Sequence, residues 1–117
     1  MTETSLAPPS VTEPLPEIVA AHLDELRALC REFGVTRLEV FGSVVTSRFD
    51  PETSDVDFLV EYPPDHDLGP WAGRHTELEA RLANVMERPV DLVMAEAIRR
   101  PRFLEAIRPT RRLLYVV

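Results

Sequence analysis

The chain is short, acidic and moderately hydrophobic. Its 117 residues are enough for one domain with one core, and its 44% hydrophobic and 28% charged residues are typical of a globular protein, not of a disordered or fibrous one. The net charge of −7 argues against nucleic acid as a direct partner, because basic surfaces bind phosphate backbones. There is no apolar run of the ~20 residues that a membrane span needs and no secretory signal, so we expect a cytoplasmic protein without membrane contact.

The N-terminal part divides into a tail and a helix. Residues 1–14 are rich in proline, threonine and glutamate, which predicts a flexible tail before a folded domain at 15–117. The spacing of apolar residues then predicts one helix that begins at Pro16 and ends at Gly34. Its apolar face consists of Val19, Leu23, Leu26, Cys30 and Phe33. Cys30 is the single cysteine, so an internal disulfide is excluded and a buried hydrophobe is expected.

Three strands and two further helical regions follow. Residues 35–41 and 54–61 are predicted strands, separated by a Gly-Ser turn, one helical turn and an Asp50-Pro51 turn. A helix is predicted over 70–87, a third strand over 89–94, and two short helices or one helix from Pro101 after that. This order predicts a small α/β (α+β) fold in which a mixed sheet packs against helices.

Three carboxylates interrupt apolar strand sequences. Asp55 and Asp57 are two residues apart, so both side chains lie on one face of a strand and repel each other unless a cation lies between them. Asp91 is a lone carboxylate in the third strand and would complete a two-metal site for Mg²⁺ or Mn²⁺. The alternative is that Ser54 and Asp55 cap a turn and Asp57 faces solvent on an edge strand.

The Gly42-Ser43 pair follows the first strand and precedes these carboxylates. Glycine lets the backbone approach a ligand, and a serine that opens a helical turn offers its hydroxyl and nearby amides to anionic oxygens. The position of the pair therefore predicts a phosphate-binding turn.

Together these segments resemble a known family, the minimal nucleotidyltransferases (MNT domains) of the DNA polymerase β-like superfamily. The resemblance covers about residues 19–115, and its carriers are Gly42-Ser43, the segment 54–61, the segment 88–93 and Leu114-Tyr115. It implies a polymerase β-like core, in which Asp55, Asp57 and Asp91 are the catalytic, metal-binding carboxylates and Gly42 and Ser43 contact the triphosphate of the nucleotide.

Two features depart from the family pattern. The loop between Ser43 and Asp55 is one residue longer than is common. The family usually has an Arg-Gly pair soon after the serine, whereas this chain has Thr46-Ser47 followed by Arg48. We expect Arg48 to contact the same phosphates from a shifted position, and the alternative is an ordinary surface arginine.

The resemblance also implies a function. Short members of the family often act as antitoxins that transfer AMP from ATP to a hydroxyl of a HEPN-domain ribonuclease toxin, and a homo- or hetero-oligomer is compatible with this role. Asp91 would then be a metal ligand or also the acceptor of the hydroxyl proton. One rival is an antitoxin that only masks its partner sterically. A second rival, modification of a small molecule, is disfavoured because only about 25 residues follow the third carboxylate.

A few other residues have two interpretations. Trp71 is expected in the core, although it could stack on an adenine base. His66 and His75 are expected to be structural. The arginine-rich end of the chain is expected to form a solvated face, with contact to the nucleotide or to an acidic partner as alternatives.

Overall fold

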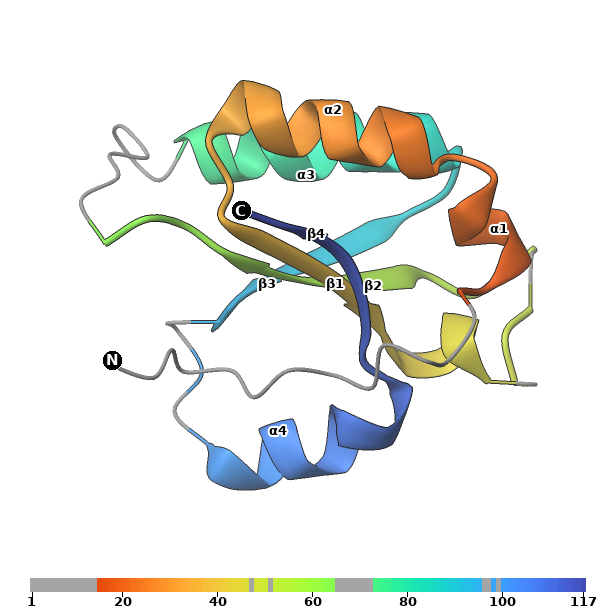
Figure 1. Ribbon diagram of the computed structural model, residues 1–117. Coiled ribbons are helices and arrows are strands. Elements are labelled where there is room, and N and C mark those ends of the chain that lie inside the picture. Colours follow the sequence, from red (N-terminus) through yellow and green to blue (C-terminus); the bar gives the residue numbers. More distant parts are fainter. Residues whose placement is uncertain (1–14, 47, 51, 65–72, 96–97, 99) are drawn as a thin grey trace.

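The computed structural model describes residues 15–117 except 47, 51, 65–72, 96–97 and 99. Within this part, a sheet of four strands in the order β3-β2-β1-β4 has helices on both faces (Figure 1). β1 (Arg37–Phe41) runs antiparallel to β2 (Val56–Glu61) and to β4 (Arg112–Val116), and β2 runs parallel to β3 (Val90–Met94). The predicted fold class, a mixed sheet packed against helices, is confirmed. The predicted tail at 1–14 lies outside the described residues.

The N-terminal region forms two helices where one was predicted. α1 (Glu17–Ala20) ends after one turn, and α2 (Leu23–Phe33) begins after His22, whose φ of −116° and ψ of 16° are not helical. The ring of His22 bonds to the Glu25 carboxylate at 2.9 Å in the first turn of α2, which favours the new start. Gly34 ends α2 with a φ of 71°, as predicted, because glycine adopts this left-handed conformation without steric cost.

Apolar side chains form a large core on one face of the sheet and a smaller cluster on the other, where one core was predicted. α2 and α3 (Gly73–Met86) lie side by side on one face (Figure 1) and cover Leu38, Val40, Phe58, Val60 and Leu92. α4 (Pro101–Ile107) lies on the opposite face and covers a smaller cluster of Phe41, Leu59 and Ala95. Side chains alternate between the faces of a strand, so Asp57 shares the α4 face with Leu59.

The C-terminal end contains an element that was not predicted. The last residues form β4, which pairs with β1 through Leu38↔Tyr115 and Glu39↔Leu113, with a register shift between these pairs. One helix starts at Pro101, which was one of the two predicted alternatives, and a 3₁₀ turn, η4 (Arg108–Thr110), follows it. Among the described residues there is no helix whose length and apolarity would let it cross a membrane.

Candidate active site

The sheet brings two of the three predicted carboxylates next to each other. Asp57 on β2 and Asp91 on β3 are direct partners in the parallel register, and Phe41 is the partner of Asp57 on β1. Asp57 is half-buried, whereas Asp91 and Asp55 are exposed. The pairing follows from two strand sequences that each carry one aspartate among apolar residues.

Side chains of α3 hold β3 in place beside Asp91. The N–H of Leu92 donates to Glu79 Oε2 at 2.9 Å, and His75 Nε2 donates to the Leu92 carbonyl oxygen at 3.0 Å. A carbonyl only accepts, so Nε2 carries a proton, and Nδ1 lies 2.9 Å from the Tyr62 hydroxyl oxygen. His75 is therefore structural, as predicted, and the backbone next to Asp91 is held from the side away from β2.

The electrostatics of the cluster single out Asp57. Burial, the charge of Asp91 and the charge of Asp55, in this order, raise its pKa from 3.8 to about 6. The third cause matches the expectation that Asp55 and Asp57 repel each other, and the second adds the same effect from Asp91. The site therefore favours a positive charge at Asp57, either a proton or a cation.

The turn that follows β1 lies directly against this carboxylate. η1 (Gly42–Val45) is the predicted helical turn, and Gly42 has a φ of 84°. A Cβ atom at Gly42 would lie 2.6 Å from Asp57 Oδ2, so any side chain here would displace the carboxylate. The half-buried Ser43 follows, and its carbonyl oxygen accepts both the N–H and the hydroxyl of Thr46 at 2.9 Å. The absence of a side chain at Gly42 thus lets the backbone of the η1 turn lie directly against the Asp57 carboxylate.

The three carboxylates are suitable ligands for a divalent cation, but they do not lie close enough together to form a complete metal site. Carboxylate oxygens are the ligands that Mg²⁺ and Mn²⁺ prefer, and the raised pKa of Asp57 marks uncompensated negative charge. However, no three His, Cys, Asp or Glu side chains of the described residues are grouped so that they could hold a metal ion. Asp57 and Asp91 are thus brought together, and Asp55 adds the smallest of the three effects on the pKa of Asp57. The donor set fits a divalent cation, and further approach of Asp55 would be required for all three to bind one.

The segment between η1 and β2 contains Arg48 and a capped turn. Arg48 is exposed, and its backbone N–H donates to Thr46 Oγ1 at 3.1 Å. Ser54 Oγ accepts the N–H of Asp50 at 3.0 Å, so the alternative prediction that Ser54 caps a turn is correct for this residue. Ser47 and Pro51 lie outside the described residues, as do Trp71 and His66.

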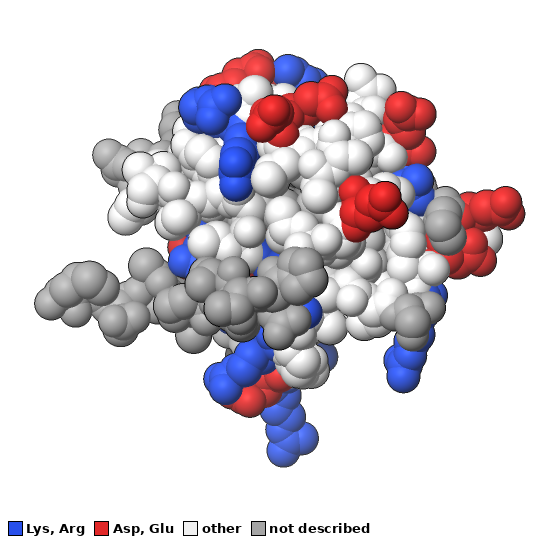
Figure 2. Space-filling view, turned by 45° about the vertical axis from the view of Figure 1, so that its right-hand side comes forward, with Lys and Arg blue, Asp and Glu red and all other residues white. Residues whose placement is uncertain are grey.

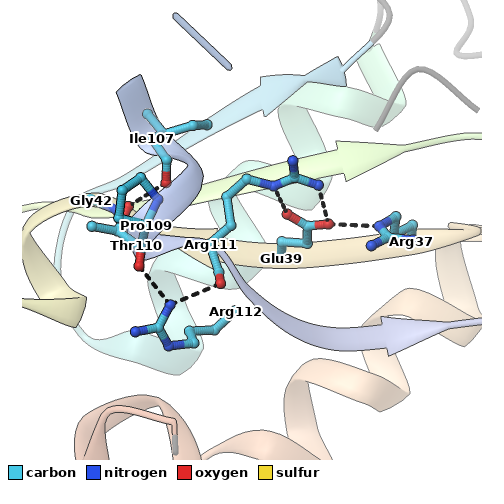
Figure 3. A network of polar contacts seen from close by, with 8 residues as sticks. All are labelled: Arg37, Glu39, Gly42, Ile107, Pro109, Thr110, Arg111 and Arg112. Atoms are coloured by element: carbon cyan, nitrogen blue, oxygen red, sulfur yellow. Dashed lines mark hydrogen bonds and ion pairs between the residues drawn. The ribbon is translucent and has the colours of Figure 1, made fainter. Parts of the chain in front are cut away.

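A buried ion pair that joins β1 to the C-terminal segment was missed (Figure 3). Glu39 on β1 is 0% exposed and accepts two hydrogen bonds from Arg111, at 2.6 and 2.8 Å, and one from Arg37 at 2.7 Å. Glu39 is a carboxylate between two apolar neighbours in a strand, as Asp57 is, and the rule that identified the aspartates would have identified it. What the rule does not provide is the partner, which is an arginine rather than a metal ion.

Thr110 was also missed, and its neighbour Arg111 corrects one prediction. Thr110 Oγ1 accepts the N–H of Gly42 at 2.9 Å.

The arginine-rich end is a solvated face where Arg100, Arg102 and Arg108 lie exposed at α4, and Figure 2 shows blue side chains gathered at the lower end of the molecule, where this helix lies. The prediction is wrong for Arg111, which is 3% exposed because it pairs with Glu39.

Solved structures with this fold include nucleotidyltransferases. One, attributed to a minimal nucleotidyltransferase, has a TM-score of 0.65 and 27% identity and covers 86% of this chain and 96% of its own. A Shewanella oneidensis complex of a tri-AMPylated HEPN toxin with an MNT antitoxin has a TM-score of 0.59 and 19% identity over 84% of this chain and 72% of its own. A toxin-antitoxin structure with AMP-PNP has a TM-score of 0.62 and 19% identity over 81% of this chain and 73% of its own.

A comparison of sequences identifies the family directly. Among curated proteins, no sequence matches the chain. The model of the nucleotidyltransferase domain family matches residues 24–114, a span that includes the η1 turn, all three predicted carboxylates and the buried ion pair. The chain therefore belongs to the nucleotidyltransferase domain family.

Proposed function

We propose that this protein is a metal-dependent nucleotidyltransferase that transfers AMP from ATP to a hydroxyl of a HEPN-type toxin and thereby acts as an antitoxin. The observation that carries the proposal is the position of Asp57, beside Asp91 in the parallel strands and against the backbone of Gly42. Family membership supports the reaction class. The HEPN toxin in complex with the similarly folded MNT antitoxin is AMPylated, and this supports the choice of acceptor.

The proposed roles follow from position and chemistry. Asp55, Asp57 and Asp91 would hold Mg²⁺ or Mn²⁺, which neutralises triphosphate charge when bound. Gly42 and Ser43 would contact the phosphates at the η1 turn, where glycine permits close approach of the backbone. Arg48 lies exposed in the segment that follows, and we propose that it contacts the same phosphates.

The transfer itself is an in-line displacement at phosphorus. The acceptor hydroxyl oxygen attacks the α-phosphorus of ATP, the bond from this phosphorus to the bridging oxygen breaks, and pyrophosphate leaves. The proton of the hydroxyl passes to a carboxylate oxygen, for which the exposed Asp91 is our candidate. The chain's own contribution is to place the phosphates and the acceptor in line, and positioning of this kind supplies much of the catalysis in phosphoryl transfer.

A second function has one observation in its favour. Among the described residues, Asp55, Asp57 and Asp91 are not grouped closely enough to hold a metal ion together. A protein with an idle site could still neutralise a toxin by covering it. Steric masking would then depend on association alone and not on the carboxylates.

One experiment separates transfer from masking. A candidate HEPN-domain toxin is incubated with ATP, Mg²⁺ and either the wild-type protein or the double variant Asp55→Ala, Asp57→Ala. Transfer predicts an adenylyl-sized increase in the intact mass of the toxin with wild type only, and loss of neutralisation by the variant even though it still associates. A toxin of unchanged mass that both proteins silence equally would contradict transfer and establish masking.

A further inference from the structure

A chain of hydrogen bonds links the η1 turn to the C-terminal part of the molecule. Gly42 donates its N–H to Thr110 Oγ1 at 2.9 Å, and the Thr110 hydroxyl donates its proton to the carbonyl oxygen of Ile107 at 2.8 Å (Figure 3). The carbonyl of Ile107 only accepts, so the direction of the hydroxyl proton is fixed. A lone pair of Thr110 is therefore presented to Gly42.

The residue after Thr110 anchors this arrangement in the interior. Arg111 binds both carboxylate oxygens of Glu39, and neither side chain is more than 4% exposed. Two parallel hydrogen bonds between a guanidinium and a carboxylate fix the mutual orientation of the groups as well as their distance. A buried ion pair contributes little net stability compared with apolar packing, and one of its attested uses is to specify a unique arrangement.

Both anchors act on the strand that leads into the turn. Glu39 lies two residues before Phe41 on β1, on the same face, and Phe41 is the register partner of Asp57. The strand from Glu39 to Gly42 is thus bound twice to the segment Thr110–Arg111, once at a carboxylate and once at a backbone N–H. Since a Cβ at Gly42 would lie 2.6 Å from Asp57 Oδ2, a small shift of the turn changes the space above that carboxylate.

We propose that Thr110 is a positioning residue for nucleotide binding: it accepts the N–H of Gly42, the buried Arg111–Glu39 pair holds it in place, and it so sets the distance between the η1 turn and Asp57. This inference rests on the proposed function for the identity of the ligand. The hydrogen-bond chain itself does not depend on that function. In this proposal Thr110 acts on the nucleotide through Gly42 and not by direct contact.

The test replaces Thr110 by valine, which keeps the shape and removes the acceptor. Thr36→Val is the matched control, because the Thr36 hydroxyl also makes a part-buried hydrogen bond to backbone, to the carbonyl oxygen of Glu61 at 3.0 Å. Thr36 precedes β1, at the end of the strand away from η1. Thr110→Ser keeps the hydroxyl and is the rescue variant.

Two quantities are measured on each folded variant. The first is hydrogen exchange of the Gly42 amide in the protein alone, with the amide of the fully buried Phe58 as internal reference. The second is the affinity for AMP-PNP with Mg²⁺. Because Thr110→Val loses one hydrogen bond at the turn, we expect the Gly42 amide to exchange about tenfold faster. We expect the affinity for AMP-PNP to fall by about tenfold as well. We expect Thr110→Ser and Thr36→Val to stay close to wild type in both measurements.

The outcomes distinguish this inference from the proposed function. Unchanged Gly42 exchange in Thr110→Val overturns the inference, and so does unchanged nucleotide affinity when the wild type binds. Equal losses in Thr110→Val and Thr36→Val also overturn it, because both would then report stability only. If the wild type binds no nucleotide, the proposed function fails, and the exchange of Gly42 alone decides whether Thr110 holds the turn.

Discussion

Asp57→Asn should make the metal-free protein more stable at neutral pH. The substitution keeps the size of the side chain and removes a charge that burial, Asp91 and Asp55 all disfavour. A rise in pKa from 3.8 to about 6 corresponds to at most about 3 kcal/mol against the ionised form. The carboxylate is only half-buried, so solvent screening reduces the expected effect to about 1 kcal/mol.

The effect should depend on pH in a defined direction. The folded state binds the Asp57 proton more tightly than the unfolded state does, so this group contributes its full stability below a pH of about 4. The contribution is lost as the pH rises from about 4 through about 6, and it stays lost above that range. Since asparagine does not titrate, the gain of the variant over wild type should be larger at neutral pH than at a pH near 4.

Urea denaturation of both proteins at about pH 4.5 and about pH 7.5 measures this difference in the free energy of unfolding directly. Asp24→Asn is the control, because Asp24 lies exposed in the first turn of α2, where a negative charge favours the helix, and its removal should lower stability at pH 7.5 by roughly 0.5 kcal/mol. Added Mg²⁺ should stabilise wild type and leave Asp57→Asn unchanged. An Asp57→Asn protein that is no more stable than wild type at pH 7.5 would refute the repulsion on which the metal site is argued.

Three further substitutions test other contacts. Gly42→Ala and Gly34→Ala both place a side chain at a positive φ, and each should lower the free energy of unfolding in urea by about 1–2 kcal/mol. Only Gly42→Ala should weaken AMP-PNP binding, because only its Cβ meets Asp57. Equal affinities of the two variants would refute that contact. Arg48→Ala should weaken AMP-PNP binding by about tenfold or more relative to the exposed Arg31→Ala, and indistinguishable affinities in calorimetry would make Arg48 a bystander. Arg111→Met should lower the free energy of unfolding by about 3 kcal/mol, because the buried carboxylate of Glu39 loses its bidentate partner. The exposed Arg31→Met should lower it by roughly 0.5 kcal/mol. A similar small loss in both variants would contradict the buried pair.

The inner strands, the end of α2 and the position of α3 could be predicted because local pattern decides them. β2 is apolar except at its two acidic positions, and Gly34 ends α2 with the positive φ that glycine provides. β4 was missed because it is an edge strand that starts with an arginine, has half-buried and exposed residues beside Leu114, and pairs with a register shift. Such a strand depends on its neighbour more than on its own alternation.

The site residues that the pattern of their own strand marks could be predicted, and their partners far away in the sequence could not. A carboxylate in an apolar strand indicates a buried charge that needs a partner, and this identified Asp57 and Asp91, which the parallel register places side by side. Glu39 fits the same pattern, but its partner Arg111 lies 72 residues later, in a segment whose arginines look like a solvated face. Neither this pairing nor the contact of Thr110 with Gly42 has a local signal, because both depend on how β4 docks against β1.

Calorimetry of ATP binding with and without Mg²⁺ tests the central claim, a metal-dependent nucleotide site formed by Asp55, Asp57, Asp91 and the η1 turn. The account predicts that wild type binds ATP with Mg²⁺ and far more weakly without it, and that Asp57→Asn loses the metal-dependent part while it stays folded. Equal ATP affinity in the presence and absence of the metal, or full Mg²⁺-dependent binding by Asp57→Asn, would contradict it.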